Sequence, residues 1–153
     1  MNGAESPLEI SRATLCEREV SLKMDHESAV AHVRSTFEDV GFRAVTEYSP
    51  SVRFGHATNA IPGSHTVLGF EIPNAEDRGL ATADERIAVL YPLSVSIRSD
   101  EPDVQRVYYL DVLRLAPGLN LTTDEERWLG VVAELEGLIY DAFDALEADI
   151  DHL

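Results

Sequence analysis

Residues 87–97, IAVLYPLSVSI, constrain the fold of this chain more than any other segment. Every second residue is large and apolar, and those between are mostly small or polar. The apolar series comprises Ile87, Val89, Tyr91, Leu93, Val95 and Ile97. Strict alternation is typical of a strand with one buried face, because a helix would spread these side chains around its whole circumference. The segment therefore predicts a central strand of an antiparallel sheet that is covered on one face.

Shorter segments repeat this alternation along the chain. Residues 16–24, 42–48, 66–72 and 105–113 predict four further strands, the last of them reached through an acidic connection at 99–103. Gly69 lies within the 66–72 segment and permits close approach of another backbone segment. Pro92 cannot donate a hydrogen bond to a neighbouring strand, so a bulge or a sheet edge is expected there.

Two segments show the 3.6-residue period of helices. The first begins after Asp25, whose carboxylate can accept from free N–H groups, and ends at Gly41, which tolerates a left-handed conformation. The second begins at a capping box of Thr123 and Glu126 and continues for about 24 residues, or roughly 36 Å. Its apolar stripe comprises Trp128, Val131, Val132, Leu135, Leu138, Ile139, Ala142, Phe143 and Leu146. A short helix or turn is expected at 75–85.

Together these segments predict an α+β fold in the order β-α-β4-α. The antiparallel sheet has one face covered by a long C-terminal helix and a shorter N-terminal helix. A chain of 153 residues fits a single domain. We expect that domain at 16–148, after a loose N-terminal tail at 1–15 and before an acidic end at 149–153.

The net charge of −16 limits the classes of partner. Such a surface repels phosphates and anionic lipid headgroups, which argues against nucleic acid and membranes. It is expected in a salt-rich cytoplasm, where ions screen charges over about 3 Å at 1 M, although an acidic proteome encoded by GC-rich DNA would give the same composition. The lone Cys16 permits no intrachain disulfide, and we find neither a signal peptide nor a membrane-spanning run. A soluble cytoplasmic protein is expected.

Three short motifs resemble those of a known family. They are Gly55-His56-Ala57-Thr58-Asn59, then Pro73-Asn74-Ala75, and the proline-containing strand Leu90-Tyr91-Pro92-Leu93-Ser94-Val95. With the order of elements, they make residues 16–146 similar to a DUF302 domain, whose family has a TBP-like fold. Many members carry cysteine where this chain has Thr58, and some where it has Leu93, so thiol chemistry does not transfer. The family has no general assigned activity, so the resemblance implies a fold and no reaction.

The loop at 55–65 is the place where we expect a binding site, because the segment from 51 to 65 is rich in turn-forming residues and loops on rigid scaffolds often carry function. Histidines at 56 and 65 could titrate near neutral pH, and a threonine and an asparagine offer neutral donors and acceptors. The candidate ligand-binding residues are His56, Thr58, Asn59 and His65. Thr58 and Asn59 could instead satisfy only their own turn.

Other kinds of site are less favoured. A cavity under the long helix could be lined by Tyr91, Tyr109, Trp128 and Tyr140, but aromatic residues in this pattern more often fill a core. His56, His65 and Glu71 lack the spacing of metal ligands, and Ser64 lacks the GxSxG motif of acyl transfer. We therefore expect no metal, no cofactor and no catalytic residue.

The favoured function is a non-enzymatic domain that binds a small molecule or a protein partner, as a homodimer. Two alternatives stay open. The first is an enzyme acting on a small polar substrate through the loop at 55–65. The second is a purely structural homodimeric interaction module.

Overall fold

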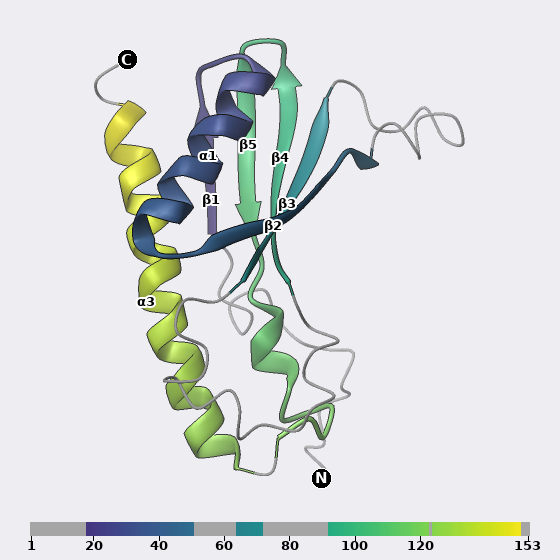
Figure 1. The fold of residues 1–153 in the computed structure, drawn as a ribbon, viewed down its shortest axis with the longest axis vertical. Coiled ribbons are helices and arrows are strands. Elements are labelled where there is room, and N and C mark those ends of the chain that lie inside the picture. The colour runs from purple at the N-terminus through teal and green to yellow at the C-terminus, as the bar shows by residue number, and fades with distance from the viewer. Residues whose placement is uncertain (1–17, 51–63, 72–91, 123, 151–153) are drawn as a thin grey trace, which may run out of the picture.

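The computed structural model describes residues 18–50, 64–71, 92–122 and 124–150 (Figure 1). The elements are β1 (Arg18–Leu22), α1 (His26–Val40), β2 (Arg43–Tyr48), β3 (His65–Glu71), β4 (Leu93–Glu101), β5 (Val104–Tyr109), the 3₁₀ helix η3 (Val112–Leu115) and α3 (Glu125–Ile150). This order of strands and α-helices confirms the predicted β-α-β4-α arrangement. The helix or turn expected at 75–85 lies outside the described residues.

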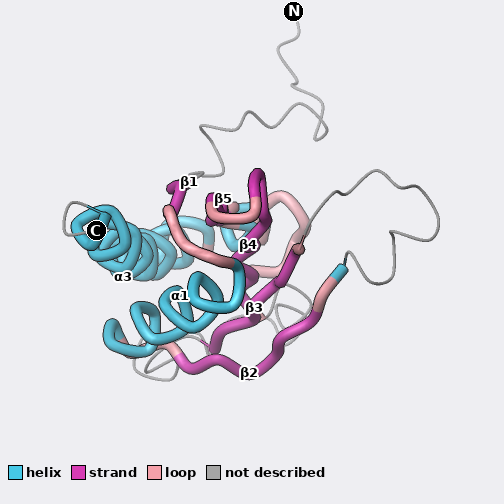
Figure 2. The backbone as a smooth tube through the Cα atoms, turned by 90° about the horizontal axis from the view of Figure 1, so that it is seen from above, coloured by secondary structure: helices cyan, strands magenta, loops and turns pink. Residues whose placement is uncertain are grey.

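The strands form one antiparallel sheet in the order β1-β5-β4-β3-β2. β4 lies at the centre, as predicted, and β1 and β2 form the edges. Figure 2 shows α1 and α3 side by side on the same side of the sheet. We call that side the covered face. No described α-helix lies on the opposite side, which we call the open face.

Alternation along β4 separates the two faces. Leu93, Val95 and Ile97 are at most 2% exposed and belong to the hydrophobic core, as predicted. Ser94 and Arg98 point to the open face and are exposed. The strand continues past its predicted end to Glu101. Tyr91, which was expected on the covered face, lies outside the described residues.

Four phenylalanines join the helices to the sheet. The ring of Phe37 on α1 stacks on that of Phe70 on β3 with centroids 4.8 Å apart, and it meets the edge of Phe143 on α3 at 5.9 Å. Phe42, just before β2, packs against the first two rings. Because aromatic pairs add about 0.5 to 1.5 kcal/mol beyond burial, this cluster fixes the helices over the sheet.

The ends of α1 are those that the sequence predicts. The Asp25 carboxylate accepts from the N–H of Ser28 at 2.7 Å, and this bond, with a second from the Ser28 hydroxyl, lowers the pKa of Asp25. Gly41 adopts φ 113°, and its N–H donates to the carbonyls of Phe37 and Glu38. A left-handed residue here lets the chain turn directly into β2.

The long helix α3 buries the predicted apolar stripe. Its N-terminal capping bond among the described residues comes from Asp124 rather than from the predicted Thr123. Asp124 Oδ1 accepts from the N–H of Arg127 at 3.0 Å, while Thr123 lies outside the described residues. Val131 and Leu138 are half-buried. The buried part of the stripe is Trp128, Val132, Leu135, Ile139, Ala142, Phe143 and Leu146.

Two local predictions were wrong. β5 ends at Tyr109 rather than at residue 113, because the Asp111 carboxylate accepts from the N–H of Leu113 at 3.0 Å and starts η3. A bulge in the β4–β5 ladder falls between Ser99 and Glu101; the residues immediately before Pro92 lie outside the described ranges. The connection between β4 and β5 is therefore residues 102–103 alone.

Candidate functional site

A pocket of about 440 Å³ lies on the open face, where side chains from β3, β4 and β5 meet. Each of these strands contributes the alternate side chains that point away from the helices. The lining comprises Tyr48, Pro50, His65, Val67, Ser94, Ser96, Tyr108, Leu110 and Val112. The walls are mostly apolar, and the polar atoms gather at His65 and the two serines. This combination is typical of a site for a small molecule with one polar end.

His65 has one partnered and one unpartnered ring nitrogen. Its Nε2 lies 2.7 Å from the Ser96 hydroxyl, whereas its Nδ1 is buried and has no hydrogen-bond partner among the described residues. Burial lowers the pKa of His65, and the nearby charge of Arg98 lowers it further. Both effects favour the neutral imidazole.

Gly69 lies beside this pocket, between Ser94 and β2. A Cβ atom at this position would lie 2.7 Å from Pro92 Cγ and would also overlap the Thr46 hydroxyl. Real Cβ atoms essentially never come so close to their neighbours, so this position favours glycine. The neighbours are side chains, and not the backbone segment that the sequence predicted.

A second polar cluster lies on the covered face and joins β3, β4 and β5 to the start of α1. His26 Nδ1 lies 2.8 Å from Gln105 Oε1, and His26 Nε2 lies 2.8 Å from the Thr66 hydroxyl. The Ser99 hydroxyl also donates to Gln105 Oε1, at 2.7 Å. We call these four residues the His26 cluster. Both ring nitrogens of its histidine are partnered.

The amide of Gln105 determines the tautomer of His26. Gln105 Nε2 donates to the carbonyls of Met24 and Pro102, both at 3.3 Å, which leaves Oε1 facing the imidazole. Because Oε1 only accepts, His26 Nδ1 must donate, and Nε2 of the neutral ring accepts from Thr66. This order of hydroxyl, imidazole and amide is that of a catalytic triad. However, Thr66 is only 7% exposed, so the arrangement stabilises the fold rather than presenting a nucleophile.

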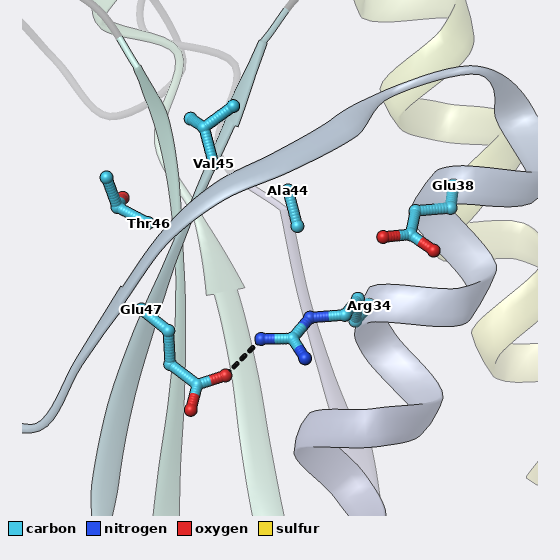
Figure 3. A pocket seen from close by; sticks show the side chains of 6 residues that line it. All are labelled: Arg34, Glu38, Ala44, Val45, Thr46 and Glu47. Atoms are coloured by element: carbon cyan, nitrogen blue, oxygen red, sulfur yellow. Dashed lines mark hydrogen bonds and ion pairs between the residues drawn. The ribbon is translucent and has the colours of Figure 1, made fainter.

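A third candidate is a pocket of about 330 Å³ between α1 and β2. Figure 3 shows Arg34 and Glu38 reaching from α1 toward β2, where Arg34 forms an ion pair with Glu47. The side chains of this pair are 41% and 47% exposed, so water competes with any ligand for them. The open-face pocket, whose walls are mostly apolar, is the better candidate.

Comparison with known proteins identifies the family. The model of DUF302, a domain of unknown function, matches residues 18–146. This chain belongs to the DUF302 family. The crystal structure of an uncharacterised conserved DUF302 protein from Bacillus stearothermophilus has a similar fold, with a TM-score of 0.67 and 12% identity over 84% of this chain and 95% of that one. No curated protein matches the chain.

Of the ligand-binding residues predicted for this DUF302 domain, His65 lies in the open-face pocket. His56, Thr58 and Asn59 lie outside the described residues. The sequence did not indicate Ser94, Ser96 or Tyr108 as site residues. Alternation along 87–97 placed both serines on the open face, and this was the signal that could have found them.

The aromatic residues expected to line a cavity under α3 have other surroundings. Tyr109 and Trp128 are each 3% exposed within the hydrophobic core, and the Trp128 indole N–H donates to the Leu113 carbonyl at 2.8 Å. Tyr140 is half-buried, with its ring 4.9 Å from the guanidinium of Arg18. Tyr91 lies outside the described residues.

Within the described ranges, the DUF302 domain contains no group of three or more histidine, cysteine, aspartate or glutamate side chains that could hold a metal ion. No helix among the described residues is both long enough and apolar enough to span a bilayer.

Proposed function

We propose that this DUF302 domain binds a small, largely apolar molecule in the open-face pocket, with its polar end beside His65, Ser94 and Ser96. The combination of mostly apolar walls with these three polar side chains is the main support for the proposal. The pocket volume of about 440 Å³ suits a small organic molecule.

Binding is a better proposal than catalysis for this pocket. Ser96 and His65 resemble a nucleophile and its base, because 2.7 Å separates their polar atoms. A working pair also needs a group that orients the other ring nitrogen, and no described residue contacts His65 Nδ1. We therefore assign these residues to ligand recognition.

Native mass spectrometry of the protein purified from its own host tests this function. The wild type is expected to retain a small molecule, and Ser94→Phe, which fills the pocket from an exposed position, is expected to lose it. Ser21→Phe is the matched control, because Ser21 is an exposed serine of the same sheet, on edge strand β1. Absence of a retained molecule in the wild type, or equal retention by Ser94→Phe, contradicts the proposal.

We propose self-association through the edge strand β2 as a second function. The large hydrophobic side chains that are exposed among the described residues are Val45 at 40%, Tyr48 at 53% and Leu119 at 54%, and the first two lie on β2. An edge strand also offers unpaired backbone groups to a second copy. Light scattering in molar KCl is expected to give a dimer mass for the wild type and for Leu119→Lys, but a monomer mass for Val45→Lys. A monomeric wild type contradicts this proposal.

We also propose that the domain works in a salt-rich cytoplasm. The support is its net charge of −16, whose self-repulsion mobile ions would relieve. The denaturation midpoint is expected to rise between low and molar KCl. A flat or falling midpoint contradicts the proposal.

A further inference from the structure

We infer that the ligand of the open-face pocket is an uncharged aromatic molecule, whose ring lies between Tyr48 and Tyr108. Val67 and Ser96 would form the floor beneath that ring. This inference rests on the proposed binding function and adds the chemical class of the ligand.

The two tyrosines belong to one row of residues that crosses four strands. Tyr48 on β2 pairs with Val67 on β3. Val67 pairs with Ser96 on β4, and Ser96 pairs in turn with Tyr108 on β5. All four side chains line the pocket. The row therefore has a large aromatic residue at each end and two shorter residues between them.

The spacing of this row suits one aromatic ring. Neighbouring strands lie about 4.8 Å apart, so the three spacings from β2 to β5 put the backbones of the two tyrosines roughly 14 Å from each other. Tyr48 is 53% exposed and Tyr108 is half-buried, so both rings keep accessible surface. A ring midway between them can reach both at the centroid separations of about 4.5 to 7 Å that aromatic pairs prefer.

The described lining of the pocket offers no charge to a ligand. None of the described residues that line it is aspartate, glutamate, lysine or arginine. Burial and the nearby charge of Arg98 lower the pKa of His65, which favours the neutral imidazole. A charged ligand would lose its hydration against Val67, Leu110 and Val112 without an opposite charge to replace it. An uncharged ligand avoids this cost.

The charged side chains in the next row of the open face compensate one another. Arg98 lies opposite His65 on one side and opposite Arg106 on the other. Both arginines contact Asp100, at 3.9 and 2.9 Å, and Arg106 also contacts Glu19 at 3.2 Å. Two cations thus meet two anions, so this row does not favour an ionic ligand in the pocket beside it.

The polar side chains of the pocket suit a single neutral group on the ligand. The hydroxyls of Ser94 and Ser96 can each donate and accept, and that of Ser96 also lies 2.7 Å from His65 Nε2. One hydroxyl or amide on the ligand can be satisfied here. A sugar would instead leave most of its hydroxyls against the apolar walls, which disfavours a carbohydrate.

Benzyl alcohol, cyclohexylmethanol, benzoate and benzylammonium are suitable probes, because they are similar in size and differ in aromaticity or charge. Each is titrated at neutral pH into the ¹⁵N-labelled full chain, and the amide shifts of β3, β4 and β5 are followed. Molar KCl shortens the screening length to about 3 Å, so the net charge of −16 does not decide the result. Benzyl alcohol is expected to bind at least about threefold more tightly than cyclohexylmethanol, and at least about tenfold more tightly than either ion.

Two variants test the tyrosines separately. Tyr48→Leu and Tyr108→Leu are each expected to lower the preference for benzyl alcohol over cyclohexylmethanol by about twofold or more. Tyr140→Leu is the matched control, since Tyr140 is a half-buried tyrosine of α3 on the covered face. It is expected to leave the preference unchanged. Because the readout is a ratio of two affinities, a variant that only lowers stability does not alter it.

The possible outcomes are distinguishable. If cyclohexylmethanol or either ion binds as tightly as benzyl alcohol, the inference is overturned while the binding pocket stands. If both pocket variants keep the wild-type preference, or if Tyr140→Leu loses it as they do, the two tyrosines do not hold the ring and the inference is overturned. If no probe shifts the pocket amides, the inference is overturned as well, and the retention experiment with Ser94→Phe decides the proposed function separately.

Discussion

Two histidines on opposite faces of one sheet differ in how completely their hydrogen bonds are satisfied. On the covered face, both ring nitrogens of His26 have partners at 2.8 Å. On the open face, His65 has a partner at Nε2 and none among the described residues at Nδ1. A fully satisfied polar cluster holds its elements together, whereas an incompletely satisfied one contributes less to stability.

The same difference applies to the surroundings of the two residues. The His26 cluster includes Gln105, which is 0% exposed, and it fastens the N-terminus of α1 to three strands. The pocket around His65 is formed by side chains that no described α-helix covers. Substitutions should therefore act on stability at the covered face and on ligand binding at the open face.

The largest effect on stability is expected at Leu93 on β4, and its neighbour Ser94, which faces the opposite side of the sheet, is the comparison. Leu93→Ala should lower the free energy of unfolding by about 2 to 5 kcal/mol, because Leu93 is 2% exposed and its loss leaves a cavity. Ser94→Ala should change it by less than about 0.5 kcal/mol. Urea denaturation at fixed KCl measures both. A loss for Leu93→Ala no larger than for Ser94→Ala would show that the faces are wrongly assigned.

The buried carboxyl of Asp111 tests whether the polar groups on the covered face are all as fully hydrogen-bonded as His26. Burial raises the pKa of Asp111 to about 6, and the charge of Glu136 adds to this effect. The pKa of Asp111 in the folded protein lies above its unfolded value of 3.8. The protonated carboxyl therefore contributes fully to stability below pH 3.8, and this contribution is lost as the pH rises through 6.

Asp111→Asn should therefore be more stable than the wild type at pH 7, by about 3 kcal/mol at most. The amide keeps an oxygen that can accept from the N–H of Leu113. The advantage should shrink toward zero as the pH falls below 4, and denaturation curves of both proteins across this range measure it. A difference that does not change with pH would contradict the assignment of the titration to Asp111.

Gln105→Leu tests the His26 cluster directly. The substitution leaves the carbonyls of Met24 and Pro102 and the N–H of His26 without their partner, so a loss of about 2 to 3 kcal/mol is expected. Amide hydrogen exchange should show faster opening at the start of α1 than in the middle of α3. If stability is unchanged, the His26 cluster does not hold the start of α1 to the sheet as its geometry indicates.

The smallest effect on stability is expected at His65. His65→Ala removes an imidazole with an unsatisfied nitrogen, so the free energy of unfolding should change by less than about 0.5 kcal/mol, against a loss of about 1 to 2 kcal/mol for His26→Ala. Urea denaturation of the two variants compares them. Equal losses would mean that His65 is as structural as His26.

The fold could be predicted from local signals because period and capping act over a few residues. Leu93, Val95 and Ile97 are buried as their alternation indicates, and α1 lies between Asp25 and Gly41. The end of β5 could not be predicted, because a single hydrogen bond from the Leu113 N–H to the Asp111 carboxylate turns an apolar strand-like segment into η3. The described cap of α3 differs by one residue from the prediction, since Thr123 and Asp124 are both good capping residues.

The site could be predicted only in part. His65 was identified by its residue type, but its contact Ser96 lies on another strand, 31 residues away. Alternation gives the face of each strand, but the register decides which residues are opposite one another. Whether Nδ1 finds a partner is thus a property of strand pairing that no local pattern contains.

The pairing of β1 with β5 also determines how late the sheet can be completed during synthesis of the chain. Arg18 cannot meet Tyr109 until the ribosome has made every strand between them, and α3 covers this edge only once nearly the whole chain exists. At about 5 to 20 residues per second, the apolar side of β1 waits several seconds for its partners. Throughout that delay, repulsion between the excess acidic residues would oppose association of unfinished chains.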